Sequence, residues 1–150
     1  MATQESLIKS TLTGDAPWAA LVTGGTFDWD NLGNQGSTPE NLEVLGAFNT
    51  AGALKVTCVV TFGADTPRSE IPSIAEQRFF TLWLYQEKGF AALRTAKKHA
   101  KRLLHDKSVG VSDDEAINTC HYDDAREFYA QELGSRPAIA IRFHIVYVKK

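Results

Sequence analysis

The stretch RFFTLWLYQEKGFAALRTAKKHAKRLLH, residues 78–105, contains one change of hydrophobic period. Up to Tyr85 the side chains alternate between two faces, which predicts a strand with partners on both sides: Phe80, Leu82 and Leu84 against Phe79, Thr81, Trp83 and Tyr85. After QEKG the apolar residues follow helical spacing from Phe90 to His105: Phe90, Leu93, Ala96, Ala100, Leu103 and Leu104. A strand followed directly by a long amphipathic helix predicts a sheet with that helix packed on it.

Other stretches on both sides of this one show the same two periods. Residues 54–62 alternate as a strand whose buried face would carry Leu54, Val56, Cys58, Val60 and Phe62. Residues 138–148 predict a long final strand, and a strand at a chain terminus can lie at a sheet edge and pair with a neighbouring subunit. Residues 4–12 and 15–22 predict short helices, the second capped by Asp15. The sequence therefore predicts one α+β domain over residues 1–150: an antiparallel or mixed sheet, covered on one side by one long and one or two short helices.

Two regions interrupt this pattern and predict long loops, near residues 31–53 and 106–137. The first follows a possible short strand at residues 26–30 and is rich in turn-forming residues. The second includes a possible strand at residues 117–122, followed by a charged, partly helical excursion. Loops of this length are where a protein commonly contacts its partners.

Composition narrows the classes of protein. The chain has 150 residues, 43% hydrophobic and 23% charged, which favours a globular core over disorder. A net charge of −2 argues against a surface that binds nucleic acid all over. Two cysteines, and the lack of a basic-then-apolar leader or a long apolar run, favour a protein with free thiols in a reducing compartment, outside any membrane.

No stretch carries a recognisable catalytic or nucleotide-binding motif, so we expect no enzyme and no cofactor. Residues 120–124, CHYDD, include metal-ligand types, but neighbouring side chains on a strand point to opposite faces and no second ligand pair exists. The expectation is therefore no metal site. A nucleophilic Cys–His pair stays open as an alternative, because such partners meet only in the fold: Cys58 or Cys120 with His99, His105, His121 or His144.

The polar side of the helix at residues 90–105 is basic, with no acid among its members: Arg94, Lys97, Lys98, Lys101 and Arg102. Like charges three or four residues apart disfavour a helix slightly, so something must compensate. One reading is a solvated face balanced by acids from the SDDE and DDAREFYAQE segments. The other is a face presented to DNA phosphates or to an acidic partner.

Aromatic residues within polar sequence are the candidate anchors of a subunit or partner interface: Trp29, Phe128 and Tyr129. Trp83, inside the predicted strand, is expected to belong to the core. The functional alternative to core packing is that Phe128 and Tyr129 form an interface, and that the charged segment around them becomes ordered on contact.

Four segments together resemble the tail terminator, or tail completion, proteins of long-tailed bacteriophages: PWAALVTGG, LKVTCVVTFG, RFFTLWLYQEKGFAALRTAKKHAKRLL and QELGSRPAIAIRFHIVYV. The resemblance implies an α+β subunit of a hexameric ring in the virion neck, made in the host cytoplasm. Such a ring ends polymerisation of the tail tube protein and binds a head completion or stopper protein. DNA passes through its lumen without sequence-specific binding.

Other classes of function remain open at this point. The chain departs from the family pattern in its two long connections, near residues 31–53 and 106–137, which leaves the loop contacts undefined. The alternatives are another ring component of the neck, such as a head–tail connector or stopper, and a small protein-binding adaptor module. An unrecognised small enzyme is a further possibility, which a deep pocket with polar groups would reveal.

Overall fold

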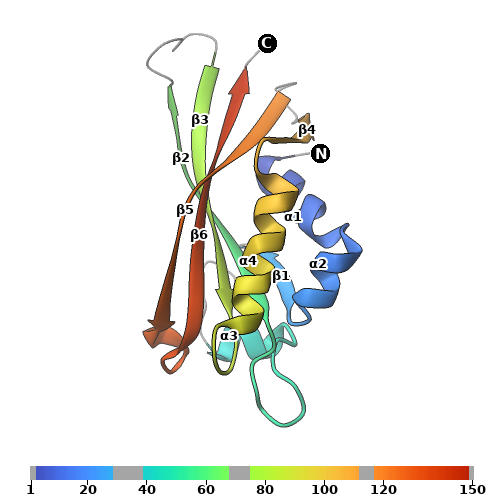
Figure 1. Ribbon diagram of the computed structural model, residues 1–150, viewed down its shortest axis with the longest axis vertical. Helices are drawn as coiled ribbons and strands as arrows, with labels where there is room; N and C mark the ends of the chain where they lie inside the picture. The colour runs from blue at the N-terminus through green and yellow to red at the C-terminus, as the bar shows by residue number, and fades with distance from the viewer. Residues whose placement is uncertain (1–2, 29–38, 68–74, 112–116, 149–150) are drawn as a thin grey trace.

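A mixed six-stranded sheet organises the chain, in the order β1-β2-β3-β6-β5-β4 (Figure 1). The computed structural model describes residues 3–28, 39–67, 75–111 and 117–148. Strand β1 is parallel to β2, and every other neighbouring pair is antiparallel. The elements are α1 (Gln4–Thr13), α2 (Ala16–Leu21), β1 (Gly25–Asp28), α3 (Pro39–Val44), β2 (Thr57–Pro67), β3 (Ala75–Tyr85), α4 (Ala91–Leu104), β4 (Lys107–Val111), β5 (Ile117–Ala130), the 3-10 turn η1 (Gln131–Leu133) and β6 (Arg136–Val148). The predicted α+β class is confirmed.

The first two helices begin at side-chain caps. The Thr3 hydroxyl accepts a hydrogen bond from the Ser6 N–H at the start of α1, at 3.1 Å. The Asp15 carboxylate accepts one from the Trp18 N–H at the start of α2, at 2.9 Å, which confirms the predicted cap. After α2 the chain passes so close to β2 that a Cβ on Gly24 would lie 2.2 Å from the Thr57 hydroxyl oxygen. Only glycine fits this crossing into β1.

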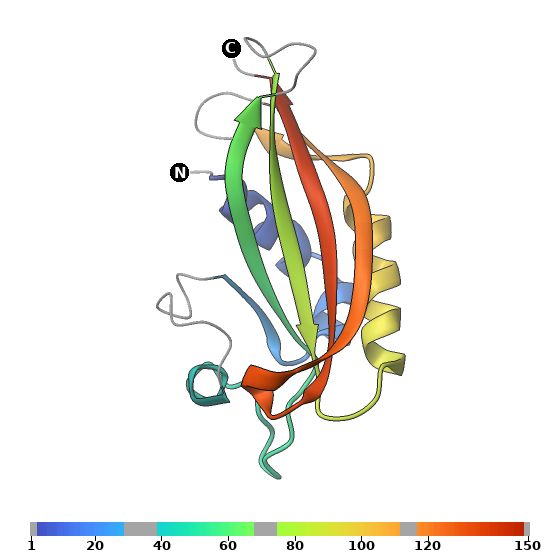
Figure 2. The same cartoon turned by 90° about the vertical axis from the view of Figure 1, so that its left-hand side faces the viewer.

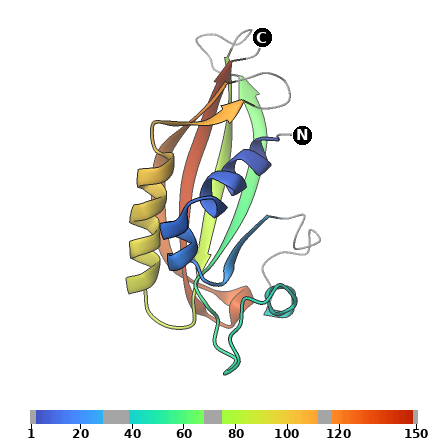
Figure 3. The ribbon, with the colours of Figure 1, turned by 90° about the vertical axis from the view of Figure 1, so that its right-hand side faces the viewer.

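Helices α1, α2 and α4 lie together on one face of the sheet (Figure 3). Helix α4 buries one side against the strands, through Leu93, Ala96, Ala100 and Leu104, as its period predicted. The facing side chains of β3 and β6 complete this main core: Phe80, Leu82, Leu84, Ile139, Ile141, Phe143, Ile145 and Tyr147. The predicted division of β3 into two faces is therefore confirmed.

A row of four aromatic rings crosses the sheet within this core. Phe62 stacks on Phe80, and Phe80 on Phe143, with ring centres 5.2 Å apart in both pairs. Tyr122 meets the edge of Phe143 at 5.8 Å. Each ring comes from the next strand of the series β2, β3, β6, β5, at directly opposed positions. The row thus joins the four central and longest strands in one register.

The opposite face of the sheet is largely uncovered by helices (Figure 2), except at one end. There α3 and η1 pack a second, smaller core: Leu42, Ala47, Leu54, Val59, Tyr85, Ala130, Leu133 and Ala138. The expectation of a sheet covered on one side only is thus wrong at this end. Leu54 precedes β2 and belongs to this second core, not to the alternating face predicted for it, because strand pairing begins only at Thr57. Helix α3 also lies inside the region predicted as a loop at residues 31–53.

The long loop predicted near residues 106–137 is wrong. This region contains β4 and the 14-residue strand β5, which pairs with β6 along its length. Acidic residues suggested a loop, yet strand β5 accommodates Asp123, Asp124 and Glu127 because all three are exposed to solvent. A register shift between Tyr122 and Asp124 also moves the alternation by one residue and obscures the strand period.

The final strand does not lie at an edge. Strand β6 pairs with β3 on one side and β5 on the other, so it is interior to the sheet and cannot pair with another chain. The prediction took a terminal position in the sequence for a terminal position in the sheet. The two orders differ because sheet neighbours are set by side-chain packing across strands, not by order along the chain.

We expect Phe80→Ala to lower the free energy of unfolding by about 3–5 kcal/mol, because it empties the middle of the aromatic row. Its neighbour Phe79 is 43% exposed on the other face and supplies a matched control. Phe79→Ala should cost less than about 1 kcal/mol. Urea denaturation of both variants measures the difference, and equal losses would contradict a row that supports the fold.

Candidate assembly surfaces

The basic side of α4 divides into two parts. The Arg94 guanidinium forms two hydrogen bonds with the Glu127 carboxylate of β5, at 2.5 and 2.8 Å. The Lys101 ammonium lies 4.1 Å from the centre of the Tyr122 ring. Hydrogen bonding from Arg94, with a smaller electrostatic contribution from Lys97, holds the pKa of Glu127 below its usual value. Arg94, Lys97 and Lys101 therefore face the chain's own strand β5.

The other part of the basic side points away from the sheet. Lys98 and Arg102 are exposed, and neither forms an ion pair with a carboxylate in the described ranges. The two alternatives for this helix thus apply to different residues: Glu127, in the DDAREFYAQE segment, balances Arg94, whereas Lys98 and Arg102 are open to an external anion. The exposed cations form the outer basic pair of α4.

Helix α4 is tied to α2 by His99. Its Nε2 atom lies 2.7 Å from Asp15 Oδ2, the same carboxylate that caps α2. The hydrogen bond with His99, and next the one from the Trp18 N–H, hold the pKa of Asp15 below its usual value. One carboxylate therefore serves both a helix cap and a helix–helix contact.

Strand β5 leaves part of its outer side without a partner strand. Pairing with β4 covers only residues 117–120, whereas pairing with β6 continues to Ala130. Among the described residues, no strand pairs with the outer side of β5 beyond Cys120. The backbone of residues 123–130 is therefore an open sheet edge, which can accept a strand of another chain.

Phe128 and Tyr129 lie on this segment but face opposite ways. Phe128 packs against the second core and meets the Trp83 ring edge-on at 6.0 Å, so it is a packing residue. Tyr129 is 58% exposed and touches Phe90 beside α4, with ring centres 5.5 Å apart. Tyr129 thus stands at the open edge. Trp29, the third aromatic candidate, lies outside the described residues.

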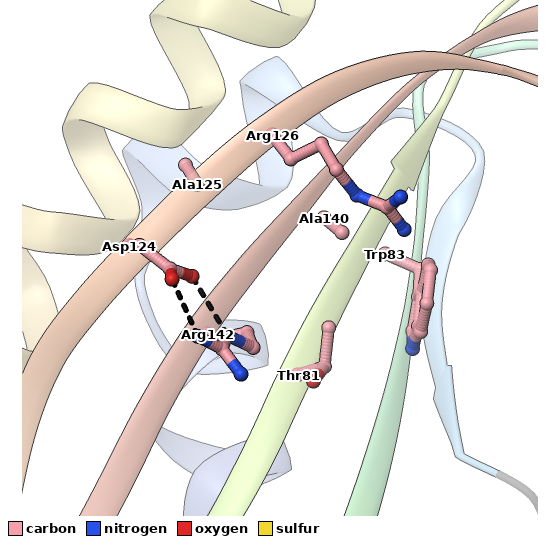
Figure 4. Close-up of a pocket in the computed structure, with 7 residues that line it drawn as sticks. All are labelled: Thr81, Trp83, Asp124, Ala125, Arg126, Ala140 and Arg142. Carbon is pink, nitrogen blue, oxygen red and sulfur yellow. Dashed lines mark hydrogen bonds and ion pairs between the residues drawn. The ribbon is translucent and has the colours of Figure 1, made fainter.

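The uncovered face of the sheet contains a shallow hollow of about 410 Å³ (Figure 4). Its wall is Trp83, whose indole N–H donates to the Thr61 hydroxyl at 2.8 Å. Arg142 is held by Asp124 in a two-bond ion pair. Arg126 lies over the Phe128 ring at 4.8 Å. This arrangement has cations and an aromatic surface for contact with a partner, but no nucleophile with an activating base.

The residues of this hollow were not predicted from the sequence. Polar side chains at alternate positions of an otherwise apolar final strand, such as Arg142, were the available signal for an open sheet face. Asp124 and Arg126 could not be assigned to the face of Arg142 from the sequence, because the register shift before Asp124 breaks the alternation along β5.

The two thiols are unsuited to nucleophilic chemistry. Cys58 and Cys120 are buried in the main core. Burial raises the pKa of Cys120 to about 12 and that of Cys58 further still. The structure therefore gives the Cys–His alternative no support: both cysteines are core residues, and neither contacts a histidine by a hydrogen bond within the described ranges.

The fold is an α+β fold: a mixed sheet with helices on one face. One edge of the sheet is open, and the opposite face is largely uncovered. None of the helices in the described ranges combines the length and apolar character needed to cross a membrane. No protein-family model matches the chain, and no curated protein matches it. Among solved structures, the chain is similar to one chain of the "Virion of native gene transfer agent (GTA) particle". The TM-score is 0.64 at 17% identity, over 99% of this chain and 96% of that chain. The two chains share a fold over nearly their whole length.

We expect the stability of this protein to fall in acid partly through Asp15. Its pKa is lowered in the folded state, so its contribution is present above its usual value of 3.8 and is lost as the pH falls through the lowered folded-state pKa. Asp15→Asn keeps a capping side chain but removes the charge. Its free energy of unfolding should therefore change less than that of the wild type between about pH 6 and about pH 2.

Urea denaturation across this range is the measurement, with Glu43→Gln, exposed on α3, as the control. An Asp15→Asn profile parallel to the wild type would refute the role of this carboxylate.

Proposed function

We propose that this chain is a structural virion protein of a phage-like particle: a ring subunit that ends tail-tube polymerisation and joins the tail to the neck. The observation that carries the proposal is the shared fold with a chain of the GTA virion, which spans 99% of this chain. At 17% identity that likeness concerns the fold, because one fold can serve several functions. The sequence resemblance to tail terminators supports the finer role.

Ring formation is supported by the open edge of β5. In a ring, one surface of each subunit contacts a different surface of the next, and the rotation between neighbours brings the last subunit back to the first. An exposed sheet edge beside an aromatic anchor, Tyr129, supplies the backbone and side-chain contacts that such an interface needs. The number of subunits expected from the family resemblance is six.

An assembly role, without catalysis or a cofactor, agrees with the chemistry of the described surfaces. The buried thiols are neutral, and the hollow beside Trp83 has no activated nucleophile. Its Arg126 and aromatic wall suit contact with another protein. The partners in this proposal are the tail tube protein on one side of the ring and a head completion or stopper protein on the other.

DNA passage gives the outer basic pair of α4 a role. Lys98 and Arg102 are exposed and unpaired within the described ranges, so they are free to contact phosphates without reading sequence. Arg94, Lys97 and Lys101 have less freedom, because they face β5. We therefore assign any DNA or acidic-partner contact of this helix to its outer pair.

We expect the purified protein to form a closed oligomer, several times the 16.5 kDa chain mass, and to cap the ends of tail tubes. Tyr129→Ala should weaken oligomerisation at least about tenfold at unchanged thermal stability, since Tyr129 is an exposed anchor. Phe128→Ala, the matched control, should instead lower stability by about 2–4 kcal/mol, because it unpacks Trp83.

Light scattering over a range of concentrations, with and without tail tube protein, gives the outcome. A monomer indifferent to the tube would favour the adaptor alternative. A ring that binds head-side neck proteins but leaves tube ends open would favour a connector or stopper.

We expect the double reversal Lys98→Glu/Arg102→Glu to leave the folded monomer intact and to reduce the yield of DNA-filled, tailed particles at least about tenfold, by repelling phosphates or an acidic partner. The matched control is Arg94→Gln, which loses the Glu127 contact but keeps the outer pair. Particle counts by complementation measure the effect. A normal yield of particles from the double variant would contradict a contact of Lys98 and Arg102 with DNA or an acidic partner.

A further inference from the structure

Two histidines face each other on neighbouring strands of the uncovered sheet face. His121 of β5 and His144 of β6 occupy directly opposed register positions. Their ring centres are 5.1 Å apart, with an angle of 31° between the ring planes. Both side chains are partly open to solvent, 32% exposed for His121 and 20% for His144. A small solute can therefore reach the pair.

Each ring is oriented by a carboxylate at Nδ1. The His121 Nδ1 atom lies 2.9 Å from Asp106 Oδ1, and the His144 Nδ1 atom lies 2.9 and 3.0 Å from the two oxygens of Asp123. A carboxylate accepts, so Nδ1 carries the proton and the lone pair of a neutral imidazole is on Nε2. Neither Nε2 atom has a hydrogen-bond partner among the described residues. This carboxylate–imidazole arrangement is the one that orients histidine ligands in metal sites.

We propose that His121 and His144 chelate a divalent transition-metal ion, such as Ni²⁺, Cu²⁺ or Zn²⁺, through their Nε2 atoms. Two imidazoles bound through nitrogen to one tetrahedral ion place their ring centres about 5 Å apart, as found for this pair. Imidazole ligands select these ions over Mg²⁺ and Ca²⁺, which require oxygen. The site lies within one chain, so it does not depend on the proposed ring.

The protein supplies two ligands to this ion, and water completes the coordination. Within the described ranges, no three His, Cys, Asp or Glu side chains converge on one point. His105 is the nearest further imidazole, with its ring centre 6.4 Å from that of His121. Both of its nitrogens are engaged: Nδ1 accepts from the Tyr122 N–H at 2.9 Å, and Nε2 lies 3.3 Å from Asp106. His105 therefore stays outside the site.

Bound metal would link β5 to β6 beside the point where β5 loses β4 as a partner. Because the ion binds only the folded arrangement of the two strands, it adds stability in proportion to the logarithm of its concentration above the dissociation constant. The melting temperature should therefore rise with Ni²⁺ and not with Mg²⁺.

The test is calorimetric titration of tag-free protein with Ni²⁺, and separately with Mg²⁺, at neutral pH. We expect saturable binding of one Ni²⁺ per chain and none of Mg²⁺. His121→Gln and His144→Gln should each weaken Ni²⁺ binding at least tenfold, and Asp123→Asn by about 10–100-fold. His99→Gln is the matched control, because that imidazole is committed to Asp15, and it should leave Ni²⁺ binding unchanged.

Binding that persists unchanged in both His121→Gln and His144→Gln, or no saturable Ni²⁺ binding by the wild type, overturns the proposal. If either variant fails to fold, histidine ring NMR of the wild type decides instead. Zn²⁺ should shift the Nε2 signals of His121 and His144 and leave those of His99 in place. Shifts spread evenly over the four histidines would refute the site.

Discussion

The aromatic row across β2, β3, β6 and β5 is the constraint on which the remaining structure depends. Phe80 and Phe143 are fully buried, and each stacks on a ring of the adjacent strand. Displacing any strand by one residue would move its ring to the opposite face, so the row opposes every change of register. Cations lie over both ends of the row, Arg78 over Phe62 and Lys101 over Tyr122. The helices and the open face acquire their positions from this fixed sheet.

The basic helix α4 shows how one element serves packing and surface together. Its cations are compatible with one another because Glu127 neutralises Arg94 and the Lys101 ammonium forms a cation–π contact with Tyr122. The last turn of a helix also favours positive charge. Internal compensation therefore accounts for the inner cations without any external anion. The cations left for contact with a partner are the outer basic pair, which points away from the sheet.

The distribution of helices over the sheet bears on the proposed assembly role. Helices protect one face, while the other face and the β5 edge beyond Cys120 keep backbone groups and aromatic surface available. A protein that stays monomeric commonly blunts such an edge by covering it or ending it early. Here charged side chains and the bulge before Asp124 flank the edge, which limits random pairing while leaving room for a specific neighbour.

The sequence by itself determined the kind of several main elements and most residues of their buried sides, because periods of two and 3.6 are local properties of the chain. The strand faces of β3, the buried stripe of α4, the Asp15 cap and the basic residues of α4 all follow from that. Only the tertiary structure decided the neighbours: β6 inside the sheet, Glu127 under Arg94, and His121 beside His144. These contacts join residues far apart in sequence, and a local period cannot predict them, since pairing across strands is settled by packing of the whole core.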